Sequence, residues 1–182
     1  MNVKKYDVLM LGSGLPGSIL AAIIARMGLN ILMIEKGRHP RFAIGEAMLP
    51  QSTMWMLLLG ERFNLPEIEE ITSVATVNSK VSKHCGQKRT ISFMYHHPGQ
   101  RQNQKESHQV IAPEVPFSSE SHFMRSEIDQ HMVGVAERCG AHYIDETDVV
   151  SFDLKENDVS LETDKGERFQ ARLLIDGSGF RS

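Results

Sequence analysis

Near its amino end the chain reads Gly12-Ser13-Gly14-Leu15-Pro16-Gly17, and this glycine-rich loop separates two segments of different hydrophobic pattern. Before it, residues 6–11 form a short, nearly continuous apolar run, which is typical of a parallel strand covered on both faces. After it, residues 18–27 are rich in Ile, Leu and Ala, and Gly28 stands where a left-handed residue would end a helix. Residues 30–34 then predict a second buried strand, which completes a right-handed βαβ unit.

The glycine-rich loop matches the pattern G-x-G-x-x-G and lies after a predicted strand and before a predicted helix. Glycines there permit a tight turn and a close approach to a pyrophosphate, and the helix amino terminus supplies N–H donors. Glu35 follows the second strand, where a carboxylate can accept ribose hydroxyls and repel the extra phosphate of NADP, and Lys36 is next to it. The pattern favours a dinucleotide site over a purely structural turn, without distinguishing FAD from NAD.

Two further helices are predicted. One covers residues 51–59. The other begins at Ser126, where Ser126 and Asp129 have the spacing of a capping box, and it ends at Gly140. Its apolar residues recur at helical spacing, so we expect one face to pack on the sheet.

The other segments are read mainly as strands and loops. Residues 75–81 and 90–95 are predicted strands of another layer, and residues 98–116 are polar and read as an exposed excursion. From residue 149 a β-meander leads into a buried strand at residues 173–175. The predicted fold class is therefore α/β, a Rossmann-type nucleotide-binding fold with a parallel sheet, a β-meander and a partial antiparallel layer on the substrate side.

Composition limits the classes of function. With 182 residues, 41% of them apolar, the chain suits one soluble domain. Its 20 Lys and Arg against 23 Asp and Glu give no general reason to bind nucleic acid or an anionic membrane. The two cysteines, Cys85 and Cys139, suggest reduced thiols, and no apolar stretch is long enough to span a bilayer, so the expected location is cytoplasmic. His96, His97 and His122 lack the spacing of a metal site, and no metal is predicted.

Three segments carry a resemblance to a known family. The segment from His39 through Arg41 and Glu46 to Pro50 reads HPRFAIGEAMLP and resembles the P-R-F-x-I-G-E-x-x-x-P segment of flavin-dependent halogenases, FAD-dependent monooxygenases and geranylgeranyl-reductase-like proteins. Residues 120–129 resemble the family's segment in which an Arg leads into a helix near the flavin. Residues 176–182 resemble its D-[GA]-S-G-x-x-S segment near the FAD pyrophosphate.

The resemblance implies that FAD is the cofactor. Without it, the charged residues of these segments would be read as surface ion pairs and caps. The implied FAD-binding residues are Gly12, Ser13, Gly14, Leu15, Pro16, Gly17, Glu35, Lys36, Arg41, Ile44, Gly45, Glu46, Arg125, Asp176, Gly177 and Gly179.

Lys88 and Phe93 form K-x-x-x-x-F, which resembles the segment where flavin-dependent halogenases place the lysine that handles hypohalous acid. A different alignment with the same halogenase segment would place the lysine at Lys83. A further alternative is that these lysines simply form a solvent-exposed, lysine-rich face. The implied function is halogenation with reduced FAD, O2 and halide, in which Lys88 directs the electrophile to a small-molecule or carrier-tethered substrate. A separate flavin reductase is an implied partner.

Two other functions stay open at this point: an FAD-dependent monooxygenase or geranylgeranyl-reductase-like enzyme, and a non-catalytic flavin-binding fragment. The W-x-W-x-I-P segment of halogenases would lie beyond Ser182, and Trp55 is the one tryptophan. We therefore expect residues 1–182 to be the amino-terminal part of an FAD-binding domain, with residues 75–118 as a substrate-side excursion. The last strand would lack its usual cover, so a truncated fold is expected.

Overall fold

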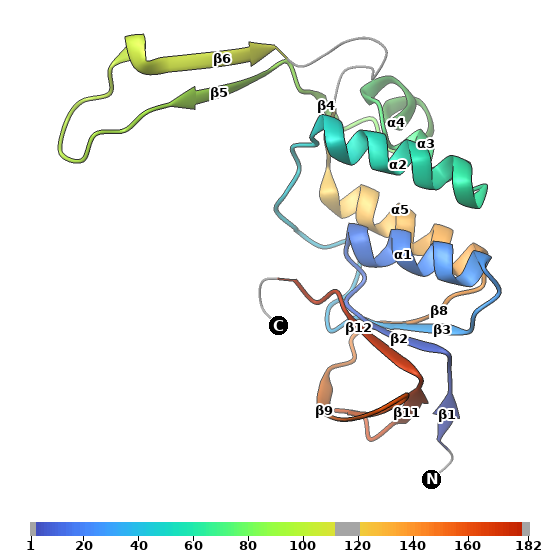
Figure 1. Cartoon of the computed structure of the whole chain (residues 1–182). Coiled ribbons are helices and arrows are strands. Elements are labelled where there is room, and N and C mark those ends of the chain that lie inside the picture. Colours follow the sequence, from blue (N-terminus) through green and yellow to red (C-terminus); the bar gives the residue numbers. More distant parts are fainter. Residues whose placement is uncertain (1–2, 112–120, 180–182) are drawn as a thin grey trace.

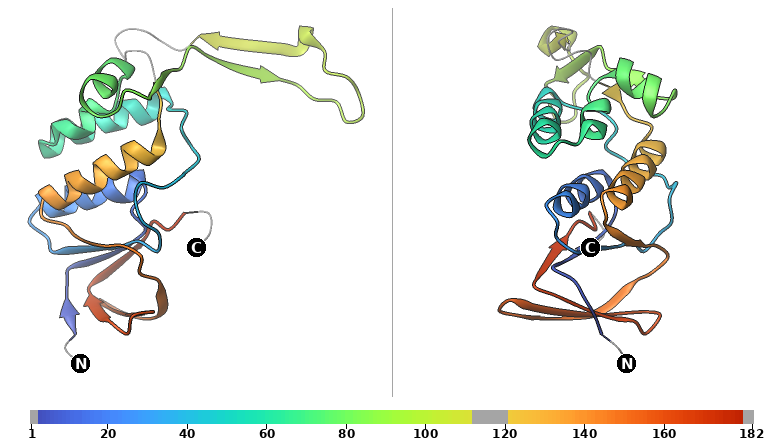
Figure 2. Two further views of the ribbon diagram at one scale, coloured as in Figure 1. Left: turned by 180° about the vertical axis from the view of Figure 1, so that it is seen from behind. Right: turned by 90° about the vertical axis from the view of Figure 1, so that its right-hand side faces the viewer.

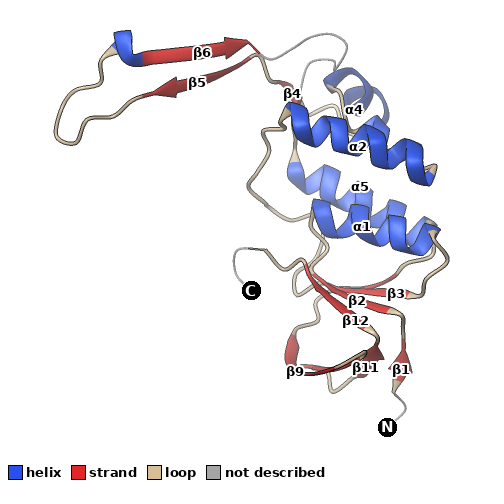
Figure 3. Ribbon diagram, viewed as in Figure 1, coloured by secondary structure: helices blue, strands red, loops and turns tan. Residues whose placement is uncertain are grey.

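A computed structural model describes residues 3–111 and 121–179, and every structural statement below refers to these residues. A four-stranded parallel sheet lies between a layer of helices and a second, mainly antiparallel sheet (Figures 1 and 3). In spatial order the parallel strands are β12 (Leu173–Asp176), β2 (Val8–Leu11), β3 (Ile31–Ile34) and β8 (His142–Ile144). The predicted α/β fold of Rossmann type is confirmed.

Alternation of side chains along the central strands divides the interior into two cores. In β2, Val8 and Met10 join the core beneath the helices, whereas Leu9 joins the core against the second sheet. In β3, the corresponding residues are Ile31 and Met33 on the helical side and Leu32 and Ile34 on the other. Burial on both faces explains why these strands are continuous apolar runs.

Helices α1 (Leu15–Arg26) and α5 (Arg125–Arg138) lie side by side on one face of the parallel sheet (Figure 2). Each ends before a glycine with positive φ, Gly28 at 83° and Gly140 at 105°, as their sequences predict. The predicted capping box of α5 is wrong. Met124 is the N-cap residue, without a side-chain cap, and Asp129 instead accepts from Arg125 one turn earlier.

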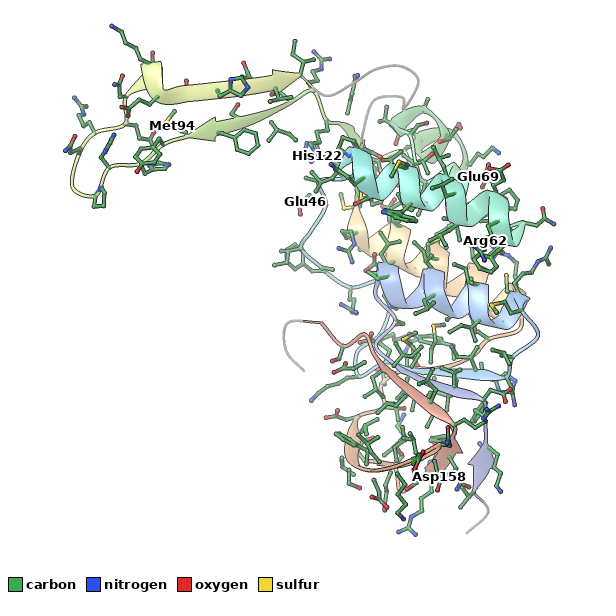
Figure 4. All side chains as sticks on the ribbon, viewed as in Figure 1. Glu46, Arg62, Glu69, Met94, His122 and Asp158 are labelled. Atoms are coloured by element: carbon green, nitrogen blue, oxygen red, sulfur yellow. The ribbon has the colours of Figure 1, made fainter. Side chains whose placement is uncertain are left out.

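A second group of helices covers α1 and α5 on the side away from the sheet: α2 (Pro50–Phe63), α3 (Pro66–Glu70) and α4 (Val74–Lys80). The predicted helix at 51–59 is confirmed and is longer at both ends. Gly60 of α2 allows close packing, since a Cβ there would lie 2.5 Å from Cγ of Glu69 on α3, a residue labelled in Figure 4.

The predicted strand at residues 75–81 is wrong, because this segment forms α4. Its β-branched residues favour a strand, but the Ser73 hydroxyl accepts from the Thr76 N–H and caps a helix, and Val77 is fully buried. A local cap together with tertiary packing outweighs the strand propensity of the segment.

The predicted β-meander is present as β9 (Val149–Lys155), β10 (Asp158–Thr163) and β11 (Arg168–Ala171). The short β1 (Lys4–Lys5) adds to β11 in parallel, and the sheet covers the face of the parallel sheet opposite the helices. Strand β12 is less buried than predicted, with Leu173 52% exposed, because it is an edge strand whose strand neighbour among the described residues is β2.

A hairpin arm extends from the body of the molecule (Figure 1), and Met94, labelled in Figure 4, lies on it. It consists of β5 (Thr90–Met94) and β6 (Ser107–Ile111), with the short helix η1 (Gln104–Glu106) between them. The strand predicted at 90–95 is confirmed, and β6 lies within the predicted excursion, of which residues 112–116 fall outside the described part. At the base of the arm, β4 (Gly86–Gln87) pairs with β7 (Ser121–His122).

Across residues 3–111 and 121–179, none of the helices combines the length and apolar character needed to cross a membrane.

Candidate functional site

The glycine loop connects β2 to α1 and also contacts the segment after β12. A Cβ on Gly12, whose φ is +84°, would lie 2.5 Å from the Gly177 carbonyl oxygen, and a Cβ on Gly17 would lie 2.6 Å from the Gly12 carbonyl oxygen. These two glycines are therefore required by backbone packing. Gly14 differs, because its Cβ would meet only the Arg41 Nη2, at 4.0 Å. The loop is thus open at Gly14, where a phosphate can approach the amino end of α1.

Glu35 lies directly after β3 and is 7% exposed. Its Oε2 accepts from the Ser13 N–H, the Ser13 hydroxyl and the Arg41 Nη2, each at 3.0 Å, and its Oε1 accepts from the Gly37 N–H at 2.9 Å. Burial raises the pKa of the Glu35 carboxyl, but these hydrogen bonds and the Arg41 charge outweigh it, and the net pKa is lowered. Glu35 is therefore a carboxylate at neutral pH, held by its donors.

A cleft of about 600 Å³ lies beside the glycine loop, at the carboxyl ends of the parallel strands. Gly12, Glu35 and Arg41 contribute to its lining from the parallel-sheet side. Val149 and Phe152 of β9 contribute an apolar wall that no sequence motif indicated. This position and size suit a nucleotide.

The residues around the cleft also fit the charge of a nucleotide. Within the described chain the Arg41 Nε is buried without a hydrogen-bond partner, so it has a donor to offer an anion. Lys36 lies at the rim, where its Nζ is 2.6 Å from Asp148 Oδ2. An open glycine loop, a carboxylate and a guanidinium are the groups that pyrophosphate and ribose require.

Asp176 and the residues after it close one side of the cleft. The Asp176 Oδ1 accepts from the Ser178 N–H at 3.0 Å and from the Ser178 hydroxyl, and these bonds lower the pKa of the Asp176 carboxyl. Gly177 lies against β2, since a Cβ there would be 3.0 Å from the Leu11 carbonyl oxygen, and Gly179 has a φ of +86°. The remainder of the predicted motif, residues 180–182, lies outside the described residues.

Arg125 anchors the segment that links the cleft to the base of the arm. Its guanidinium makes a bidentate pair with the fully buried Asp129, at 2.8 and 2.9 Å, and donates to the carbonyls of Ile44 at 2.7 Å and Gly45 at 3.2 Å. Glu46 turns back on this loop and accepts from the Gly45 N–H at 3.0 Å. The predicted residues of this segment are brought together, although the Ile44 side chain is 77% exposed.

Lys88 and Lys83 differ sharply in environment. Lys88, which follows β4, is 3% exposed, and its Nζ donates to the Met48 carbonyl, whereas Lys83 is exposed. Lys88 does not share a strand with Phe93, which lies on the arm in β5 and is 58% exposed.

Lys88 lies where three segments join. The Met48 N–H donates to the Ser121 carbonyl at 3.1 Å, and the Phe123 N–H donates to the Glu46 carbonyl at 2.8 Å. Figure 4 shows Glu46 and His122 next to each other at this junction. The buried Lys88 side chain is therefore held against the same segment whose Ile44 and Gly45 carbonyls accept from Arg125.

Comparisons with known proteins identify the relatives of this chain. The family model described as FAD binding domain matches residues 5–182. Monodechloroaminopyrrolnitrin halogenase PrnC of Pseudomonas fluorescens is 35% identical over 177 residues, which cover 97% of this chain and 31% of that protein. Tetracycline 7-halogenase of Kitasatospora aureofaciens is 34% identical over 179 residues, which cover 98% of this chain and 32% of that protein.

Among solved structures, halogenase PltM in complex with phloroglucinol and FAD aligns with a TM-score of 0.82 and 31% identity, over 94% of this chain and 34% of that chain. The chain thus spans about a third of the length of these relatives. Because the family model covers nearly the whole chain and the cleft suits a dinucleotide, the chain belongs to the FAD-binding domain family, and its cofactor is FAD.

Proposed function

We propose that this chain is the FAD-binding part of a flavin-dependent halogenase that acts on a small molecule. The observation that carries the proposal is the position of Lys88, which is 3% exposed and donates to the Met48 carbonyl, in the segment whose Ile44 carbonyl accepts from Arg125. Halogenases that align over almost the whole chain support it. A separate flavin reductase and a cytoplasmic location are part of the proposal.

In this proposal, the protein binds and orients the cofactor. The open loop at Gly14 and the amino end of α1 receive the pyrophosphate, with Arg41 as a charged donor. Glu35 accepts ribose hydroxyls. When bound, FAD supplies the redox chemistry by which O2 and halide give hypohalous acid.

The proposed role of Lys88 follows from its burial. An ammonium removed from water can donate a hydrogen bond to hypohalous acid without competition from solvent. After it loses a proton, the neutral amine can instead take the halogen from hypohalous acid, which gives a haloamine and releases water. The Lys88 Nζ donates to the Met48 carbonyl, which holds the side chain at the junction of the three segments. Lys88 would then pass the electrophilic halogen to the substrate.

We also propose that the arm faces the substrate side of the complete enzyme. Phe93, Tyr95 and Ile111 are 58%, 66% and 76% exposed, so the arm presents apolar surface far from the nucleotide cleft. Exposed apolar patches of this kind mark interaction surfaces. Of the predicted excursion at 75–118, residues 75–80 belong to α4 in the helical layer, and residues 86–111 form the arm and one strand of its base. Residues 112–118 lie outside the described part.

Halide dependence separates the proposal from its alternatives. The chain is supplied with reduced FAD, O2, bromide and an electron-rich phenol such as phloroglucinol, and brominated product is measured by mass spectrometry. The expected result is bromination that requires both halide and Lys88. Hydroxylated product, or reductant consumption independent of halide, would instead indicate a monooxygenase or a reductase, and bound flavin without turnover would indicate a non-catalytic fragment.

A further inference from the structure

Ser13 lies in the glycine loop, and its side chain is fully buried. Its hydroxyl oxygen is 3.0 Å from Glu35 Oε2 and 2.8 Å from His39 Nε2. One hydroxyl therefore connects the proposed ribose-binding carboxylate to an imidazole that the proposed function does not use.

The direction of these two hydrogen bonds follows from counting protons. A serine hydroxyl has a single proton, and an ionised carboxylate can only accept. Glu35 is ionised at neutral pH, so the Ser13 proton points to Glu35 Oε2, and the Ser13 oxygen accepts from His39. The opposite arrangement would place oxygen lone pairs against a carboxylate at 3.0 Å. His39 must then carry its proton on Nε2.

The surroundings of His39 keep the imidazole neutral. Burial and then the Arg41 charge lower the pKa of His39, against the opposite effects of Glu35 and Asp129. The Nδ1 of His39 is buried without a hydrogen-bond partner among the described residues, so a proton there would have no acceptor. The neutral Nε2–H tautomer is the form that satisfies this site.

The consequence for Glu35 is a fixed carboxylate with one oxygen available. Three donors hold Oε2, whereas Oε1 accepts only from the Gly37 N–H among the described residues. A carboxylate oxygen accepts two hydrogen bonds readily, so Oε1 retains capacity for a ribose hydroxyl.

We propose that His39 is a positioning residue for the adenosine end of the nucleotide: by donating from Nε2 to Ser13, it directs the serine proton to Glu35 and fixes Oε1 for the ribose hydroxyls. This inference rests on the proposed role of Glu35 as the ribose acceptor. His39 touches neither ribose nor phosphate in it, and acts through Ser13 alone.

Calorimetric titration of the whole chain with ADP and with 2′,3′-dideoxy-ADP tests the inference. The wild-type chain should prefer ADP. His39→Leu removes the donor and should weaken ADP binding about three- to tenfold, the loss expected for one hydrogen bond, with little effect on the dideoxy compound. His39→Gln, which keeps an N–H donor, should stay within about twofold of wild type. His108→Leu, the same replacement on the exposed arm, serves as the matched control.

Selectivity between the two nucleotides separates positioning from a general structural role. An equal loss for both nucleotides in His39→Leu, or a His39→Gln variant as weak as His39→Leu, would overturn the inference while leaving nucleotide binding intact. A wild-type chain that binds no ADP would instead overturn the proposed function along with it.

A ligand-free measurement adds a second criterion. The 15N shifts of the His39 ring in the labelled wild-type chain should show the Nε2–H tautomer and should change in Ser13→Ala. The Nδ1–H tautomer would overturn the inference whatever the affinities.

Discussion

The guanidinium of Arg41 lies 3.0 Å from the Glu35 carboxylate, so the two charged residues of the nucleotide cleft are paired with each other. Glu35 is nearly buried, and the side chain of Arg41 is 33% exposed. Ribose and phosphate therefore meet an acceptor and a donor already fixed side by side, and less ordering is needed on binding.

The low pKa of Glu35 makes stability depend on pH. A carboxyl whose pKa is lower in the folded than in the unfolded chain stabilises the fold above the unfolded pKa, and this contribution is lost as the pH falls through the folded pKa. We expect the difference in unfolding free energy between wild type and Glu35→Gln to shrink as the pH is lowered below about 4.5, the usual pKa of such a carboxyl. Urea unfolding at a series of pH values measures it, and a difference that grows in acid would contradict the assignment.

Replacing Gly12, Gly14 or Gly17 with alanine should change the stability of the fold by different amounts. At Gly12 and Gly17 the added Cβ would lie 2.5 and 2.6 Å from backbone oxygens, so each replacement should destabilise the fold by roughly 1–3 kcal/mol. Gly14 has an extended backbone, φ −63° and ψ 171°, with open space, so Gly14→Ala should leave stability within about 0.5 kcal/mol of wild type. Thermal unfolding of the three variants without flavin compares them, and a Gly14→Ala variant as unstable as the others would show that the loop is closed.

Arg125 and Asp129 form a buried pair in which each partner needs the other. Arg125→Leu leaves the fully buried Asp129 carboxylate unpaired and should cost about 3–5 kcal/mol of unfolding free energy. The double variant Arg125→Leu with Asp129→Leu should be more stable than the sum of the single losses indicates. Strict additivity in a double-mutant cycle would mean that the pair contributes nothing beyond its separate contacts.

Replacing Lys88 and Lys83 one at a time shows which of them is the lysine that handles hypohalous acid. If the proposed halogenase function holds, Lys88→Met should abolish bromination while flavin binding stays within about threefold, because Lys88 is not among the residues that line the nucleotide cleft. Lys83→Met should retain bromination, because that side chain is exposed. Product formation and flavin affinity are measured on the same samples, and the reverse pattern would favour Lys83.

The parts of the fold that are local in sequence could be predicted, and those that depend on distant packing could not. The βαβ unit, the glycine ends of α1 and α5 and the β-meander follow from periodicity and turn residues. Residues 75–81 were predicted wrongly, since strand propensity gives no sign of the Ser73 cap or of the buried position of Val77. Asp129 forms an ion pair rather than a cap, because Arg125 precedes it by one helical turn.

The candidate site shows the same limit. The glycine loop and Glu35 are recognisable because their spacing is fixed by a single βαβ unit. Phe152 carries no such signal, since it reaches the cleft from a meander strand far along the chain. His39 stands beside the predicted Arg41, but its link to Ser13 depends on how the chain folds back after β3. The burial that separates Lys88 from Lys83 is likewise a property of packing.

The most direct test of the central claim, that the glycine loop and the cleft beside Glu35 bind FAD, is a flavin titration of the purified chain followed by desalting and a visible absorbance spectrum. The wild-type chain should retain flavin bands, and Gly14→Val, which fills the open side of the loop, should lose them while keeping its thermal stability. Equal retention by both chains, or a folded wild-type chain that retains no flavin, would contradict the claim.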